Sequence, residues 1–136
     1  YMRAASRLRM GQHQAALEDV QRGLDTEPDE PRFLSLLAAI YAQIGQHANA
    51  ATAFRRALAL QPYDSTLWLN LIISLNLLGE YEEALAAAEE AAPYFRTRAQ
   101  RAQLASAVET LRNALAQQAE QESTPPTQTG PTDTAD

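Results

Sequence analysis

The sequence predicts an all-α protein built as a solenoid of helical hairpins, with three repeats and a C-terminal helix that caps the last of them. Apolar residues recur at helical spacing along most of the 136-residue chain. Gly11, Gly45 and Gly79 stand 34 residues apart and are three of only five glycines. Pro28 and Pro62 keep the same interval. A helix, a glycine turn, a second helix and a proline that recur with this period indicate a repeat architecture.

The first repeat is expected over residues 1–30. A short Ala- and Arg-rich helix ends at Gly11, and a second helix follows as far as Thr26. Arg3 and Arg7 stand where the later repeats have packing residues. This end of the array is therefore expected either to fray or to contact repeats that lie upstream.

The second repeat, residues 31–64, is the most regular copy. Its first helix begins at Pro31, where a missing N–H costs little, with Asp29 as the expected cap. Gly45 permits the positive φ that ends this helix. The inner faces of its two helices consist of Leu34, Leu37, Ala38 and Tyr41, then Ala50, Ala51, Phe54, Ala57 and Leu58.

The third repeat, residues 65–92, starts at Asp64 or Ser65. Its second helix opens with glutamates, which favour the positive N-terminal end of a helix. Pro93 arrives early and shortens this helix, because proline cannot continue the backbone ladder. The inner faces consist of Trp68, Leu71, Ile72 and Leu75, then Tyr81, Ala84, Leu85 and Ala88.

Residues 93–121 are expected to form one helix, from about Tyr94 to Glu120, that covers the open end of the third repeat. Its apolar seam consists of Leu104, Val108, Leu111 and Leu115. The same seam could form a dimerising coiled coil, but two heptads are too few to stand alone, so capping is the favoured interpretation. Residues 122–136 are rich in Thr, Pro, Gln and Asp and are expected to be a disordered tail.

The second and third repeats resemble the tetratricopeptide repeat family. The residues that carry the resemblance, in the family's order and spacing, are Leu34, Leu37, Ala38, Tyr41, Gly45, Ala50, Phe54, Ala57 and Pro62, and then Trp68, Leu71, Gly79, Tyr81, Ala84 and Ala91. The resemblance implies a right-handed solenoid whose first helices line a concave surface. It also implies a non-catalytic scaffold for protein–protein interaction, with a protein or peptide as partner.

Composition excludes several other functions. The net charge of −6 argues against nucleic acid as a partner, because phosphate neutralisation needs a concentrated basic surface. The lack of cysteine excludes disulfides and thiolate metal sites. No apolar run is long enough for membrane insertion. No phosphate loop or nucleophile elbow occurs, so no enzyme activity and no cofactor are expected.

Histidines and carboxylates give no convincing site for chemistry. His13 and His47 occupy the same position in adjacent repeats, and a two-histidine metal site is conceivable. The third repeat has Tyr81 there, so the position is interpreted as one for a ring, and no metal is expected. Neighbouring carboxylates such as Glu82 and Glu83 point about 100° apart on a helix, which is poor geometry for acid–base catalysis.

The candidate binding site is the concave face. Its predicted residues are Arg9, Arg32, Leu36, Gln43, Leu69, Asn70, Ile73 and Leu77. The stripe of Leu69, Ile73 and Leu77 is typical of a groove for an extended or helical peptide. The polar groups of that peptide would be satisfied by Asn70, Gln43 and Arg32. The alternative is that the capping helix buries part of this stripe.

Tetratricopeptide domains that capture acidic C-terminal peptides hold the carboxylate with a set of Lys, Arg and Asn on this face. At the matching positions this chain has Tyr1, Ala5, Leu36 and Thr66, and only Asn70 is of a comparable kind. This clamp is therefore expected to be absent, and binding of chaperone tails is disfavoured.

Two other functions stay open at this level. The chain could be a self-assembly module, a homo-oligomer joined through the ends of the array by Arg3, Arg7 and the C-terminal seam, or a recruiting or regulatory part of a larger enzyme. The start at Tyr1, inside a helical pattern, indicates a piece of a longer protein. All eleven basic residues are Arg, which points to a GC-rich bacterial genome. A cytoplasmic location is expected, with the periplasm as the alternative.

Overall fold

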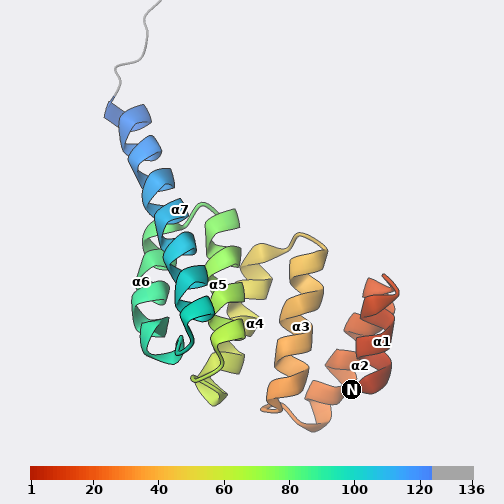
Figure 1. Ribbon diagram of the computed structural model, residues 1–136. Coiled ribbons are helices and arrows are strands. Elements are labelled where there is room, and N and C mark those ends of the chain that lie inside the picture. The colour runs from red at the N-terminus through yellow and green to blue at the C-terminus, as the bar shows by residue number, and fades with distance from the viewer. Residues whose placement is uncertain (124–136) are drawn as a thin grey trace, which may run out of the picture.

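The computed structural model describes residues 1–123, and within them every element is helical. The helices are α1 (Met2–Arg9), α2 (His13–Thr26), α3 (Pro31–Gln43), α4 (His47–Leu60), α5 (Ser65–Leu77), α6 (Tyr81–Ala91), the 3₁₀-helix η1 (Ala92–Tyr94) and α7 (Arg98–Ser123). Figure 1 shows three antiparallel hairpins that stand side by side, with α7 against the last of them. The predicted all-α solenoid of three repeats and a capping helix is confirmed.

Each hairpin turns at a glycine in the left-handed conformation. The φ angles of Gly11, Gly45 and Gly79 are 77°, 82° and 78°. A Cβ added at these positions would have no neighbouring atom within 4 Å, so it would not clash. A residue with a side chain would still be strained there, because the positive φ is unfavourable for it. The three hairpins therefore turn at the same place with nearly the same φ angle.

The expected cap of α3 is wrong by one residue. Glu30, not Asp29, precedes the helix and accepts a hydrogen bond from the N–H of Arg32 at 3.2 Å. The reason is Pro31, because the residue before a proline is pushed to an extended backbone, which is the conformation that a cap needs. Asp64 caps α5 in the usual way, through the N–H groups of Thr66 and Leu67.

The core runs without a break along the stack. Small residues lie where the helices approach closely, and large apolar residues fill the space between hairpins. The fully buried alanines are Ala16, Ala38, Ala50, Ala57, Ala84 and Ala91, and the largest fully buried side chains are Leu34, Ile40, Ile72, Leu75, Leu111 and Val20.

At the junction between the third repeat and the cap, α6 is short, as the position of Pro93 predicts, and α7 begins later than expected. Because of Pro93, α6 has 11 residues where α2 and α4 have 14. The indole N–H of Trp68 donates to the carbonyl of Pro62 at 2.7 Å, and the indole ring stacks on Tyr94. Helix α7 then begins at Arg98 rather than near Tyr94. Thr97 and Gln100 form a reciprocal capping box that sets this start.

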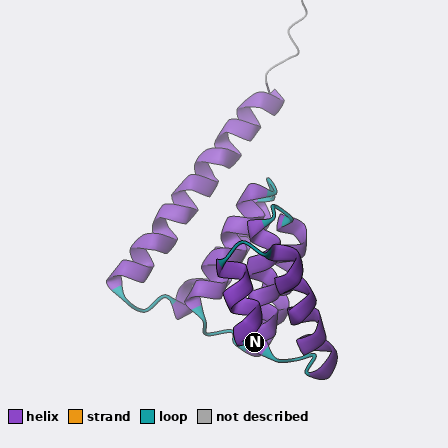
Figure 2. Cartoon of the chain, turned by 90° about the vertical axis from the view of Figure 1, so that its right-hand side faces the viewer, coloured by secondary structure: helices purple, strands orange, loops and turns teal. Residues whose placement is uncertain are grey.

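Helix α7 covers the third repeat with its first half. Leu104 and Leu111 are buried against the core, and the Gln100 amide donates to the Ser65 hydroxyl at 3.1 Å. These contacts favour the capping interpretation over a free coiled-coil seam. With 26 residues, α7 is about 39 Å long and runs past the body of the hairpins (Figure 2). Its last residues include 122 and 123, where the expected tail begins; the rest of that tail lies outside the described residues.

In the first repeat, a charged cluster joins α1 to α2, and α1 is a regular helix. The Asp19 carboxylate accepts two hydrogen bonds from Arg3, at 3.0 and 3.2 Å, and one from Arg7 at 2.9 Å. Arg22 lies 3.9 Å from the same carboxylate. The bonds from the Arg3 guanidinium hold the pKa of Asp19 below its ordinary value of 3.8. The two arginines that interrupt the packing pattern are thus bound within their own hairpin.

Replacing Leu111 by Ala tests the capping contact. Leu111 is 1% exposed, so the substitution should lower the free energy of unfolding by about 2–5 kcal/mol through lost burial and a residual cavity. Urea unfolding followed by circular dichroism measures this change. The exposed neighbour Arg112→Ala is the matched control and should change stability by less than about 0.5 kcal/mol. Equal effects of the two substitutions would contradict a buried contact for Leu111.

Asp19→Asn tests the charged cluster through its pH dependence. A carboxyl whose pKa is lowered on folding stabilises the protein above its ordinary pKa and loses that contribution as the pH falls. At pH 7 the wild type should therefore have a higher Tm than the variant. The difference should shrink as the pH is lowered through 3.8 and below. A difference in Tm that is constant between pH 7 and pH 3 would refute the ionic contribution.

A candidate partner-binding groove

Helices α3 and α5 enclose a hollow on the face lined by the first helix of each hairpin. Its volume is about 370 Å³. The residues that line it are Ala39, Ala42 and Gln43 of α3, His47 and Phe54 of α4, and Asn70, Ile73, Ser74 and Leu77 of α5. We call this the first hollow. It lies near the lower end of the 300–1,000 Å³ range, roughly, of ligand pockets.

A second hollow, of about 490 Å³, lies between α5 and α7. Its lining consists of Leu69 and Ile73 of α5 and Ala102, Gln103, Ser106 and Ala107 of α7. Ile73 borders both hollows, and its side chain is 46% exposed. Leu77 is 59% exposed. Helix α7 therefore leaves most of the apolar stripe open, and the two hollows together form what we call the concave groove.

The structure brings five of the predicted site residues to this groove and places three elsewhere. Gln43, Asn70, Ile73 and Leu77 line the first hollow, and Leu69 lines the second. Leu36 is only 9% exposed and belongs to the core. Arg9 and Arg32 border neither hollow.

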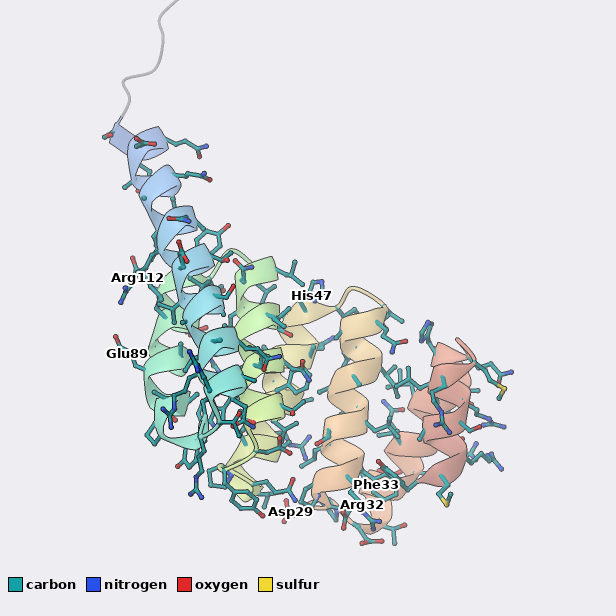
Figure 3. All side chains as sticks on the ribbon, in the orientation of Figure 1. Asp29, Arg32, Phe33, His47, Glu89 and Arg112 are labelled. Atoms are coloured by element: carbon teal, nitrogen blue, oxygen red, sulfur yellow. The ribbon has the colours of Figure 1, made fainter. Side chains whose placement is uncertain are left out.

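Arg32 is held at the far end of α3. Figure 3 shows it beside Asp29 and Phe33, at the end opposite to His47. Its guanidinium is 2.9 Å from the Glu30 carboxylate and 5.2 Å from the ring centre of Tyr1. The hydrogen bonds from Arg32 hold the pKa of Glu30 below its ordinary value. This cation is therefore already paired and is not directed into the groove.

Sequence reasoning missed the residues that close the hollows. Phe54 fits a packing position in the sequence, yet its ring lies at the edge of the first hollow, reached from α4. Ser74 occupies the position that Ile40 holds one repeat earlier, and a comparison of the repeats position by position could have found it. The α7 side chains could not be placed before the docking of that helix was known.

The groove is mostly apolar, and its polar groups carry no formal charge. No Asp, Glu or Arg is among the residues that line the two hollows, and His47 is their one ionisable side chain. The amides of Gln43 and Asn70 form no hydrogen bond within residues 1–123. These free amides can donate to and accept from a main chain laid across apolar surface.

The two histidines show the same environment. His13 and His47 are the first residues of α2 and α4, and the Nδ1 atom of each is buried without a hydrogen-bond partner. His13 borders neither hollow, so the buried Nδ1 without a partner is a property of this repeat position and not of the groove. Residues 1–123 hold no group of three His, Asp or Glu side chains placed to bind a metal ion.

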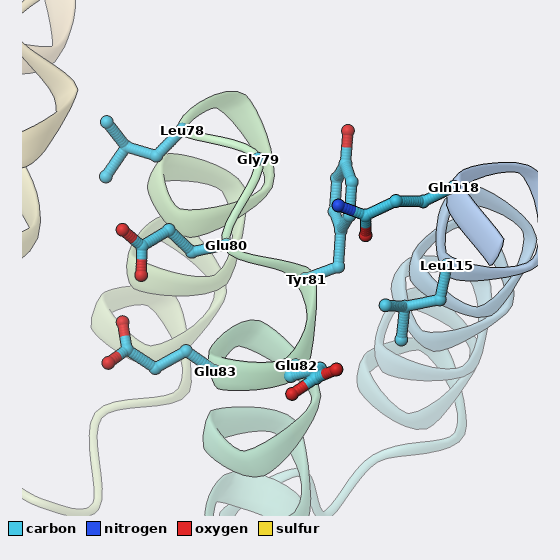
Figure 4. Close-up of a pocket in the computed structure, with 8 residues that line it drawn as sticks. All are labelled: Leu78, Gly79, Glu80, Tyr81, Glu82, Glu83, Leu115 and Gln118. Carbon is cyan, nitrogen blue, oxygen red and sulfur yellow. The ribbon is translucent and has the colours of Figure 1, made fainter. Parts of the chain in front are cut away.

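A larger hollow, of about 650 Å³, lies between the α5–α6 turn and the distal part of α7. Figure 4 shows Tyr81 beside Gln118 and Leu115 directed at α6, while the carboxylates of Glu80 and Glu83 are on the side away from α7. Glu83 lies 3.3 Å from Arg55. The lining combines one side of a turn with an outlying helix and offers no apolar stripe comparable to that of the groove.

Among residues 1–123, no helix combines the length and the apolar character that crossing a membrane requires.

Three solved structures with the same arrangement of helices are each distant from this chain in sequence. The first TPR of Spaghetti (RPAP3), bound to the HSP90 peptide SRMEEVD, is 18% identical with a TM-score of 0.73, over 85% of this chain and 89% of that one. The Sgt2 TPR domain from Aspergillus fumigatus is 22% identical with a TM-score of 0.73, over 98% and 87%. Yeast Tom70 is 20% identical with a TM-score of 0.78, over 88% of this chain and 24% of Tom70.

A comparison with curated proteins finds no match. The family model described as Tetratricopeptide repeat matches residues 1–65 and, overlapping them, residues 45–102. These matches include all three glycine turns and all three hairpins of the structure. The chain belongs to the tetratricopeptide repeat family.

Proposed function

We propose that the chain is a non-catalytic scaffold that binds a peptide or helix of a protein partner in the concave groove. The observation that carries the proposal is the exposure of Ile73 and Leu77 beside two hollows that no described helix fills. Exposed apolar residues at the rim of a hollow mark an interaction site more often than scattered ones do.

The structural neighbours support a peptide as the kind of ligand but not the same peptide. SRMEEVD, bound by the RPAP3 domain, contains three acidic residues. The groove of this chain is lined by no arginine or lysine, and Arg32, on the same helix as Gln43, is paired with Glu30. An acidic tail would find no cation here, so the proposed partner differs in chemistry from that of the neighbour.

Ile73→Arg tests the groove. The substitution puts a charge between the two hollows and should abolish binding of the partner, because an apolar contact is replaced by a cation without a counter-ion. Since Ile73 is 46% exposed, helicity by circular dichroism should be unchanged. Isothermal titration calorimetry with the partner peptide measures the affinity.

Ile44→Arg is the matched control, because Ile44 is similarly exposed but borders neither hollow. It should leave the affinity within about twofold. Equal loss of affinity in both variants would place binding on another surface, and unfolding of the Ile73 variant would mean that Ile73 belongs to the core.

A further inference from the structure

The first hollow exists because two positions change between the second and third repeats. Leu36 and Ile40 of α3 are both buried in the core. The residues 34 positions later are Asn70 and Ser74, and these face α3. The first pair is buried and apolar, whereas both residues of the second pair are polar and Ser74 is shorter than Ile40. The difference in side-chain volume leaves the hollow, with Phe54 at its edge.

Ser74 is unusual in this hollow. It is 2% exposed and is the one buried polar residue of the core within residues 1–123. Its side chain lines the hollow, and its hydroxyl forms no hydrogen bond in that part of the chain. The hydroxyl borders the open hollow and is not one of the fully buried atoms without a partner, which within residues 1–123 are the Nδ1 atoms of His13 and His47. It is therefore available to a ligand atom in the hollow.

We propose that the first hollow is a subsite for one large apolar side chain, carried by an uncharged stretch of the partner's peptide. Phe54, Ile73 and Leu77 contact the inserted side chain, while Ser74 and Asn70 bind the adjacent main chain. This inference rests on the proposed function and assigns the chemistry of its ligand.

Charge decides which side chain fits. A carboxylate or ammonium inserted between α3 and α5 would meet amides, a hydroxyl and apolar carbon but no counter-ion. Arginines elsewhere are engaged: Arg3 and Arg7 with Asp19, and Arg55 with Glu83. The net charge of −6 further disfavours an acidic peptide. A leucine, phenylalanine or tryptophan meets none of these penalties.

Selection from random peptides tests the subsite, because it does not require the identity of the natural partner. A phage-displayed library of random peptides, about a dozen residues each, is panned on the full 136-residue chain, and enriched peptides are synthesised with blocked ends. We expect a consensus with one large apolar residue between uncharged neighbours. Replacing that residue by Ala should weaken binding at least tenfold. Raising the salt concentration from 50 to 500 mM should change the affinity less than twofold.

Ser74→Ile tests the subsite by inserting the residue that the second repeat already uses. Ile40 is fully buried at the equivalent position, so the larger side chain should fit and the Tm should not fall. Affinity for the selected peptides should drop at least tenfold. Asn70→Leu, which copies Leu36 of the second repeat, is a second variant should the first be unstable. Ser6→Ile makes the same change at the equivalent position of the first repeat and should leave binding unchanged.

The outcomes separate the subsite from the proposed function. Two results would overturn the subsite while the proposed function of the groove stands. One is peptides whose binding is abolished by Ile73→Arg but unchanged by Ser74→Ile and Asn70→Leu. The other is a set of selected peptides with an acidic consensus. A failure to enrich any peptide, or peptides insensitive to Ile73→Arg, would overturn both.

Discussion

Every feature of this structure depends on the fact that a hairpin of two short helices cannot bury its apolar faces by itself. Each helix here has 8 to 14 residues, except α7 and the short η1, and such helices are marginal in water without tertiary contacts. Stacking supplies those contacts. Alanines at the crossing points, among them Ala38, Ala50 and Ala84, are fully buried and let the helices approach closely. The spacing of the hairpins, and so the dimensions of the groove, follows from these small residues.

Within residues 1–123, the outer faces of the first and third repeats are covered by different kinds of contact. At the first repeat, Asp19 binds Arg3 and Arg7. The second repeat buries an apolar residue at the equivalent positions, with Ala53 in place of Asp19 and Leu37 in place of Arg3. At the other end, α7 lays Leu104 and Leu111 on the third repeat. Ile73 and Leu77 stay exposed beside the two hollows of the concave groove.

The groove that we propose as the binding site lies where one repeat departs from another. The 34-residue period makes the scaffold, and a perfectly regular copy would fill each crossing in the same way. Asn70 and Ser74 break that regularity and leave a neutral hollow instead of a packed contact. Arg32, which the sequence pattern associates with the groove, is turned to Glu30 and Tyr1. The groove therefore takes its character from amides and apolar carbon and not from charge.

The sequence by itself determined the period, the glycine turns, the inner faces and the capping role of the last helix, because these follow from spacing along one chain segment. It also identified five of the residues that line the groove. Only the tertiary structure decided that Arg3 and Arg7 bind Asp19, that Phe54 and Ser74 border a hollow, and that Arg32 lies away from it. Those facts depend on how side chains from separate helices meet. The angle and spacing between hairpins set these meetings, and no periodicity within one helix encodes them.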